Sequence, residues 1–184
     1  TFVAGGEESY GYLVGDFVRD KDAVISCAMI AELTAYAKDG GKSVFDLLLD
    51  IYTRFGLYQE RLISLTRKGK EGAEEIKRMM ADLRADPPKE IAGSPLVRFL
   101  DYQQDIDRDV RTGEEKTTGL PKSNVLQFVT EAGDKISARP SGTEPKIKFY
   151  FSVNTALPSR DDYDVKVVEL ENRIDAIIKS MALG

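Results

Sequence analysis

The sequence predicts a mixed fold, in which a partial α/β unit precedes a complete α+β domain. Apolar and polar residues alternate over 146–153 in the way that is typical of a half-buried strand. Helical periodicity, bounded by capping and stop signals, marks other parts of the chain. Before residue 57 these patterns indicate one strand and two helices, and after it they indicate mostly strands with two helices among them. We therefore expect one unit at 1–57 and a second at 58–184.

The first unit should contain one strand and two helices. Residues 1–4 read as a short apolar strand, which Gly5 and Gly6 end. A helix over 23–38 should be packed on several sides, because apolar residues cover most of its circumference. A second helix follows it and ends at Gly56. The expected caps and stops are Asp22, Gly40 and Gly41 for the first helix, and Ser43, Asp46 and Gly56 for the second.

The second unit should be a mainly antiparallel sheet of four to five strands with two helices on one face. The helices are predicted over 69–84, before Pro87 and Pro88, and over 161–181. Residues 105–122 are very polar and are expected to be a loop. The predicted strands are 58–66, 96–102, 125–130, 135–139 and 146–153.

Composition excludes several classes of function. The chain has 184 residues, 26 basic and 31 acidic, and its net charge of −5 argues against nucleic acid or an anionic membrane as a partner. It contains no histidine, so it supplies neither a Ser-His-Asp triad nor a histidine metal ligand. Cys27 is its only cysteine, which fits a reducing, cytoplasmic location. Because the chain begins without methionine on apolar residues, we expect it to be part of a longer one.

The segment RPSGTEPK, residues 139–146, has the residue types of an oxyanion-binding loop. Arg139 offers a planar fork of donors, Ser141 and Thr143 offer hydroxyls, and Gly142 lets backbone N–H groups approach an anion. The two prolines restrict the loop before it binds. The alternative is a tight connection in which Arg139 only pairs with Glu144.

A second polar loop, GEESYG at residues 6–11, follows the first predicted strand. The carboxylate of Glu7 and the hydroxyl of Ser9 suit recognition of neighbouring sugar hydroxyls. The alternative is a solvated acidic turn. Just downstream, Arg19 and Lys21 either add a positive rim to this site or pair with their acidic neighbours in the segment RDKD.

The segments GEESYG, RDKD and RPSGTEPK, in this order along the chain, resemble the α-D-phosphohexomutase superfamily, and its phosphoglucomutase branch most of all. The resemblance covers essentially the whole chain. It implies that 1–57 is the later part of the third of four domains and that 58–184 is the fourth. It also implies a role for each candidate residue. Glu7 and Ser9 would contact the sugar, Lys21 would act at the catalytic centre with support from Arg19, and Arg139, Ser141, Gly142 and Thr143 would hold the phosphate that is not transferred.

The reaction that the resemblance implies is interconversion of glucose 1-phosphate and glucose 6-phosphate through glucose 1,6-bisphosphate. The catalytic phosphoserine and the Mg²⁺ site of the family lie in domains that this chain lacks, so we expect no metal site and no turnover from this chain alone. The expected partners are a phosphorylated hexose and the missing N-terminal domains. A homodimer is possible through apolar surface that 1–57 leaves uncovered.

Three alternatives stay open. The same loops would serve a phosphomannomutase or a phosphopentomutase of the superfamily, although the paired glutamates resemble the glucose-phosphate branch. They would also serve a non-catalytic sugar-phosphate-binding module. Finally, the chain could be a small interaction domain whose loops are only structural.

Overall fold

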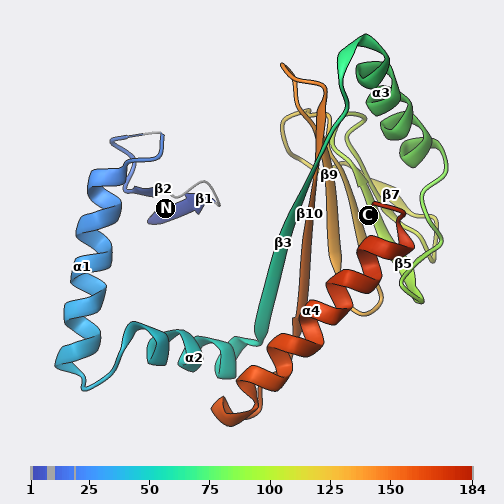
Figure 1. Ribbon diagram of the computed structural model, residues 1–184. Helices are drawn as coiled ribbons and strands as arrows, with labels where there is room; N and C mark the ends of the chain where they lie inside the picture. Colours follow the sequence, from blue (N-terminus) through green and yellow to red (C-terminus); the bar gives the residue numbers. More distant parts are fainter. Residues whose placement is uncertain (1, 8–10, 19, 184) are drawn as a thin grey trace. The chain divides into compact units, whose positions relative to one another are not determined.

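The computed structural model of the chain divides into two compact units, Thr1–Arg54 and Phe55–Gly184. Figure 1 shows their helices and strands. The structure is described for residues 2–7, 11–18 and 20–183. In this part of the chain, no helix combines the length and the apolar character that crossing a membrane would need.

The first unit begins with a β-hairpin, where a single strand over 1–4 was expected. Strand β1 (Ala4–Glu7) pairs antiparallel with β2 (Gly11–Val14). The expectation that Gly5 and Gly6 end the strand is wrong, because both lie within β1. A Cβ atom at Gly6 would lie 2.9 Å from the ring of Tyr12, its partner across the hairpin. Glycine here allows the ring to pack over the neighbouring strand.

Two helices follow, α1 (Ala23–Asp39) and α2 (Val44–Phe55), and their predicted caps are confirmed. The Asp22 carboxylate accepts hydrogen bonds from the amides of Val24 and Ile25 at 2.8 and 3.4 Å. Ser43 and Asp46 form a reciprocal capping box, in which each side chain accepts from the amide of the other, at 2.8 and 3.0 Å.

The expectation that α1 is packed on several sides is wrong for this chain. Only Ser26 and Ala37 of α1 are buried, and only Leu49 of α2. The hairpin joins α1 near its start, through the Tyr12 amide and the Ser26 hydroxyl at 3.1 Å, and so covers little of the helix. The two helices therefore expose large apolar side chains, among them Val24, Met29, Ile30, Leu33, Tyr36, Ile51 and Phe55.

The second unit is built on one antiparallel sheet in the order β3-β10-β9-β8-β5-β6-β7, with β4 paired to β5. This confirms the α+β fold class. The strands are β3 (Leu57–Thr66), β4 (Glu90–Ile91), β5 (Ser94–Asp101), β6 (Ile106–Asp109), β7 (Glu115–Lys116), β8 (Leu126–Thr130), β9 (Lys135–Pro140) and β10 (Lys146–Thr155). The sheet is thus larger than expected, and β6 and β7 lie where a loop over 105–122 was predicted.

The core lies between one face of this sheet and two helices, α3 (Gly69–Ala85) and α4 (Tyr163–Ser180). A short 3₁₀ turn (Arg160–Asp162) leads directly into α4. The predicted apolar face of β10 is confirmed, since its side chains are at most 1% exposed. Burial of each such side chain stabilises the fold by roughly 1.5–3 kcal/mol. The buried residues of β10 are Ile147, Phe149, Phe151 and Val153, and those of α4 are Leu170, Ile174 and Ile177.

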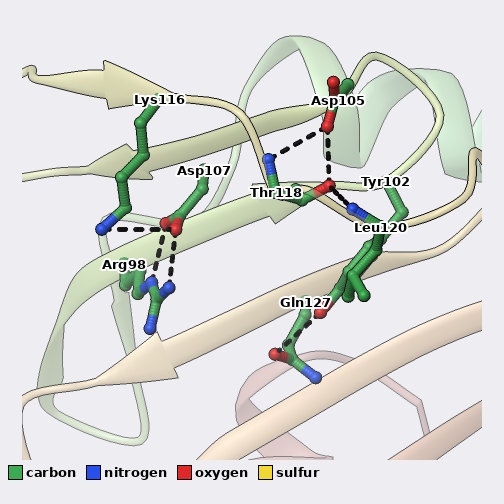
Figure 2. A network of polar contacts seen from close by, with 8 residues as sticks. All are labelled: Arg98, Tyr102, Asp105, Asp107, Lys116, Thr118, Leu120 and Gln127. Atoms are coloured by element: carbon green, nitrogen blue, oxygen red, sulfur yellow. Dashed lines mark hydrogen bonds and ion pairs between the residues drawn. The ribbon is translucent and has the colours of Figure 1, made fainter.

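Polar contacts tie the unpredicted strands to the sheet (Figure 2). The Arg98 guanidinium on β5 donates two hydrogen bonds, of 2.7 and 2.6 Å, to the buried carboxylate of Asp107 on β6. Asp105 accepts from the amide and the hydroxyl of Thr118 at 3.0 and 2.7 Å. These side-chain bonds hold a segment that has too few apolar residues to be recognised as strand.

The hydrogen bonds from Arg98 hold the pKa of Asp107 below its ordinary value. Its contribution to stability is therefore complete above the unfolded pKa of about 3.9 and is lost as the pH falls through the lower folded pKa. We expect Asp107→Asn to lower the free energy of unfolding at pH 6 and the difference from wild type to shrink below about pH 4. Urea unfolding of both proteins across this range checks it, and a pH-independent difference would contradict it.

Candidate anion-binding site

The loop over 141–145 connects β9 to β10 and is held by backbone hydrogen bonds at both ends. The Ser141 amide donates to the Lys146 carbonyl at 2.8 Å, which closes the loop. The Arg67 amide, just after β3, donates to the Pro145 carbonyl at 2.9 Å. Pro140 and Pro145 restrict the chain at the two ends. The loop is thereby shaped before any ligand arrives.

Three cations of the two strands line one cavity of about 370 Å³ beside this loop. They are Arg139, Lys146 and Lys148, and the cavity is completed by residues 140–143. Arg139 and Lys148 lie directly opposite each other in the β9–β10 register. Like charges in such a pair are destabilising, so the arrangement favours an anion between them.

The structural alternative for the loop, a pair between Arg139 and Glu144, does not form. Glu144 pairs with Lys146 instead, at 2.9 Å from carboxylate to Nζ. Over the ranges that the structure describes, the Arg139 guanidinium has no hydrogen bond to a side chain and no ion pair, and it lies at an exposed position. Its donors are therefore available to a ligand.

Ser141 organises the loop from within. Its Oγ accepts from the amides of Thr143 and Glu144, at 3.4 and 3.3 Å, while the hydroxyl proton stays free to donate. A hydroxyl that accepts in this way becomes a better donor. The Ser141 side chain thus orders the turn and offers a polarised O–H to an anion.

Neither the backbone conformation nor the packing of the protein requires a glycine at position 142. Its φ lies outside the left-handed region, and a Cβ atom there would meet no atom within 4 Å. Neither backbone strain nor packing explains the residue type. An open position on the wall of a basic cavity is what a ligand that contacts the backbone would require.

The other candidate residues lie in the first unit. Strand pairing sets Glu7, the last residue of β1, opposite Gly11, the first residue of β2. The side chain of Lys21 packs against Gly11, where a Cβ atom would lie 2.3 Å from the Lys21 Cβ. Lys21 therefore adjoins the hairpin that carries the GEESYG segment. Ser9 and Arg19 lie outside the described residues.

Lys21 also pairs with its neighbour, because its Nζ lies 3.3 Å from the Asp20 carboxylate. The amide of Lys21 and then its ammonium lower the pKa of Asp20. Asp22 serves as the cap of α1. The alternative in which the basic residues of RDKD pair with their acidic neighbours therefore holds for Lys21 and Asp20. The aliphatic part of the Lys21 side chain nevertheless packs against Gly11 of the hairpin.

Sequence reasoning missed Lys148 as a cavity residue. The period of two in β10 was the signal that could have found it, because that period puts Lys146 and Lys148 on one face. The pairing of Lys148 with Arg139 needed the register, which only the structure supplies. Among the described side chains, no group of three or more Asp, Glu, Cys or His could hold a metal ion.

Comparison with known proteins gives this arrangement a family. Residues 1–55 match the family model described as phosphoglucomutase/phosphomannomutase, alpha/beta/alpha domain III. A phosphoglucomutase of Staphylococcus haemolyticus is 39% identical over 84% of this chain and 28% of its own length. One of Staphylococcus aureus is 40% identical over 88% of this chain and 29% of its own length. The chain belongs to the phosphohexomutase superfamily.

The phosphohexomutases matched here are much longer than this chain, which spans less than a third of their length. Among solved structures, the open form of parafusin from Paramecium, described as a phosphoglucomutase, matches with a TM-score of 0.47 and 15% identity. That match covers 95% of this chain and 30% of the other. The score is too low to establish a common fold.

Proposed function

We propose that this chain is the substrate-recognition part of a phosphoglucomutase, which interconverts glucose 1-phosphate and glucose 6-phosphate. The observation that carries the proposal is the cavity where Arg139, Lys146 and Lys148 converge beside a pre-shaped loop. In this proposal the first unit is part of the third domain of the enzyme, and the second unit is its fourth domain. The identities of 39% and 40% to phosphoglucomutases support the glucose-phosphate branch.

In the second unit, the proposed ligand is the phosphate that is not being transferred. Arg139 would donate two parallel hydrogen bonds to it, and the hydroxyls of Ser141 and Thr143 would donate one each. Gly142 leaves room for the anion to approach the backbone. Because such bonds contribute about 1.5–3 kcal/mol each, a phosphate dianion can bind despite the acidic composition of the chain.

In the first unit, we propose that Glu7 and Ser9 bind sugar hydroxyls and that Lys21, supported by Arg19, contacts the phosphate that is transferred. A carboxylate accepts from two neighbouring hydroxyls, so one side chain can serve a sugar bound in either of two orientations. The reaction needs both orientations, because the bisphosphorylated intermediate has to present each phosphate in turn.

The chain's own residues bind and orient the sugar phosphate and do not attack it. We propose that the phosphoserine lies outside this chain and that Mg²⁺, also bound elsewhere, supplies charge neutralisation at the transferred group. The acidic side chains described here form no cluster that fits the metal. On its own, the chain should bind sugar phosphates without converting them.

Substitution at the two loops separates sugar recognition from phosphate recognition. We expect Glu7→Gln to weaken binding of glucose 6-phosphate and to leave binding of inorganic phosphate unchanged, because only the sugar has hydroxyls for the carboxylate. Calorimetric titration of wild type and variant with both ligands checks this. Glu131→Gln, which also removes one negative charge at an exposed position outside both loops, is the matched control. Equal losses for both ligands, or no loss for either, would contradict the assignment of Glu7.

A further inference from the structure

The anion-binding loop is anchored to the junction of β3 and α3, far from it in sequence. The only backbone hydrogen bond between them runs from the Arg67 amide to the Pro145 carbonyl, at 2.9 Å, among the bonds that the structure describes there. The position of Arg67 therefore bears directly on the end of the loop that leads into Lys146.

Arg67 is itself held by α3 through a close approach. A Cβ atom at Gly72, the fourth residue of α3, would lie 2.6 Å from the carbonyl carbon and the Cβ of Arg67 and 2.7 Å from its carbonyl oxygen. These are main-chain atoms and a Cβ, which cannot rotate away as the end of a side chain could. Gly72 is buried, and the Arg67 guanidinium donates to Glu75 on the same helix at 2.9 Å.

We propose that Gly72 is a positioning residue for the anion-binding loop, acting through Arg67 and Pro145. This rests on the proposed function only in saying what the loop binds. Alanine has a higher helix propensity than glycine, so propensity alone predicts that Gly72→Ala stabilises the protein. The contact with Arg67 predicts the opposite, because the added methyl group must push the β3–α3 junction away from α3 and draw the Pro145 end of the loop with it.

The experiment compares Gly72→Ala with Gly93→Ala in the 184-residue chain. Gly93 has φ +79 and no atom within 4 Å of a Cβ position, so alanine there adds strain without touching the loop. Amide chemical shifts of Ser141, Thr143 and Lys146 report the loop itself, and hydrogen exchange of the Arg67 amide reports its bond to Pro145. Titration with inorganic phosphate reports the consequence for binding.

For Gly72→Ala we expect shifted loop amides, faster exchange at Arg67 and about tenfold weaker phosphate binding, the equivalent of about 1.4 kcal/mol. Gly93→Ala should lower the melting temperature and change none of these. A folded Gly72→Ala protein whose loop amides keep their wild-type chemical shifts would overturn the proposal, whatever its affinity for phosphate. Shifted amides in a chain whose wild type binds no phosphate would instead uphold the positioning role and count against the proposed function.

If Gly72→Ala fails to fold, Glu75→Ala decides the matter. The ion pair between Arg67 and Glu75 is 40% and 50% exposed, so its loss leaves the fold intact. We expect the same amides to shift in the same direction but by less, because the side-chain restraint on Arg67 is released while Gly72 remains. Loop amides that stay in place would overturn the proposal.

Discussion

Arg139→Ala should abolish measurable binding of inorganic phosphate by this chain. The guanidinium lies in the basic cavity, faces Lys148 across the strand pair, and has no side-chain partner in the described ranges. The loss of one charge-assisted hydrogen bond weakens binding by at least about tenfold, and the loss of two parallel bonds multiplies the effect. Because the position is exposed, the free energy of unfolding should change by less than about 1 kcal/mol.

Arg108→Ala is the matched control for this substitution. Arg108 belongs to the same sheet and its removal changes the net charge equally, but it pairs with Glu115 outside the cavity. Calorimetry on both variants should show that only Arg139→Ala loses phosphate. A large fall in stability with phosphate binding retained would show that Arg139 is structural. An equal loss of binding in both variants would indicate attraction by overall charge only.

Asp101→Ala should give the largest fall in stability among the polar substitutions considered for the second unit. The Asp101 side chain is 1% exposed and accepts from the Arg84 guanidinium of α3 at 2.7 Å, and Arg84 is 19% exposed. Its other oxygen accepts from the amide of Gln103 at 3.0 Å. Removal leaves a largely buried cation without its counter-charge, so we expect a loss of about 3–5 kcal/mol in the free energy of unfolding.

Glu74→Ala is the matched control, because it removes an ion pair on the same helix that is exposed to solvent. The pair of Glu74 and Lys77 on α3 is 2.8 Å long and more than half exposed, so its loss should cost at most about 0.5 kcal/mol. Urea unfolding of the two variants gives the comparison. Similar small losses in both would mean that the Arg84–Asp101 contact does not join α3 to β5 in the way the structure describes.

Strongly patterned elements of this fold were predictable from the sequence. The alternation that ends at Val153 identified β10 and its buried face, and the capping box of Ser43 and Asp46 identified the start of α2. In both cases the signal is local, since strand period and helix caps depend on residues a few positions apart. The signal for the loop from Arg139 to Lys146 is also local, because the residue types that suit anion binding lie within a few positions of one another in the sequence.

Elements whose stability depends on distant partners were not predictable. The sequence of β6, IDRD, has no apolar alternation, and its pairing depends on the bond between Asp107 and Arg98. Gly6 looked like a strand end because its contact with the ring of Tyr12 lies across a hairpin. The link from Gly72 through Arg67 to the loop spans two elements, so neither residue has a sequence signature of its role.

The most direct test of the phosphate site is calorimetric titration of the wild-type chain with glucose 1,6-bisphosphate, at low ionic strength and without Mg²⁺. We expect weak, saturable binding that weakens as salt is added, because cations of the cavity, Arg139 and Lys148 among them, would meet a phosphate dianion. Absence of binding at low salt, in a chain whose amide shifts show the second unit folded, would contradict the claim that the loop over 141–145 is a pre-shaped phosphate site.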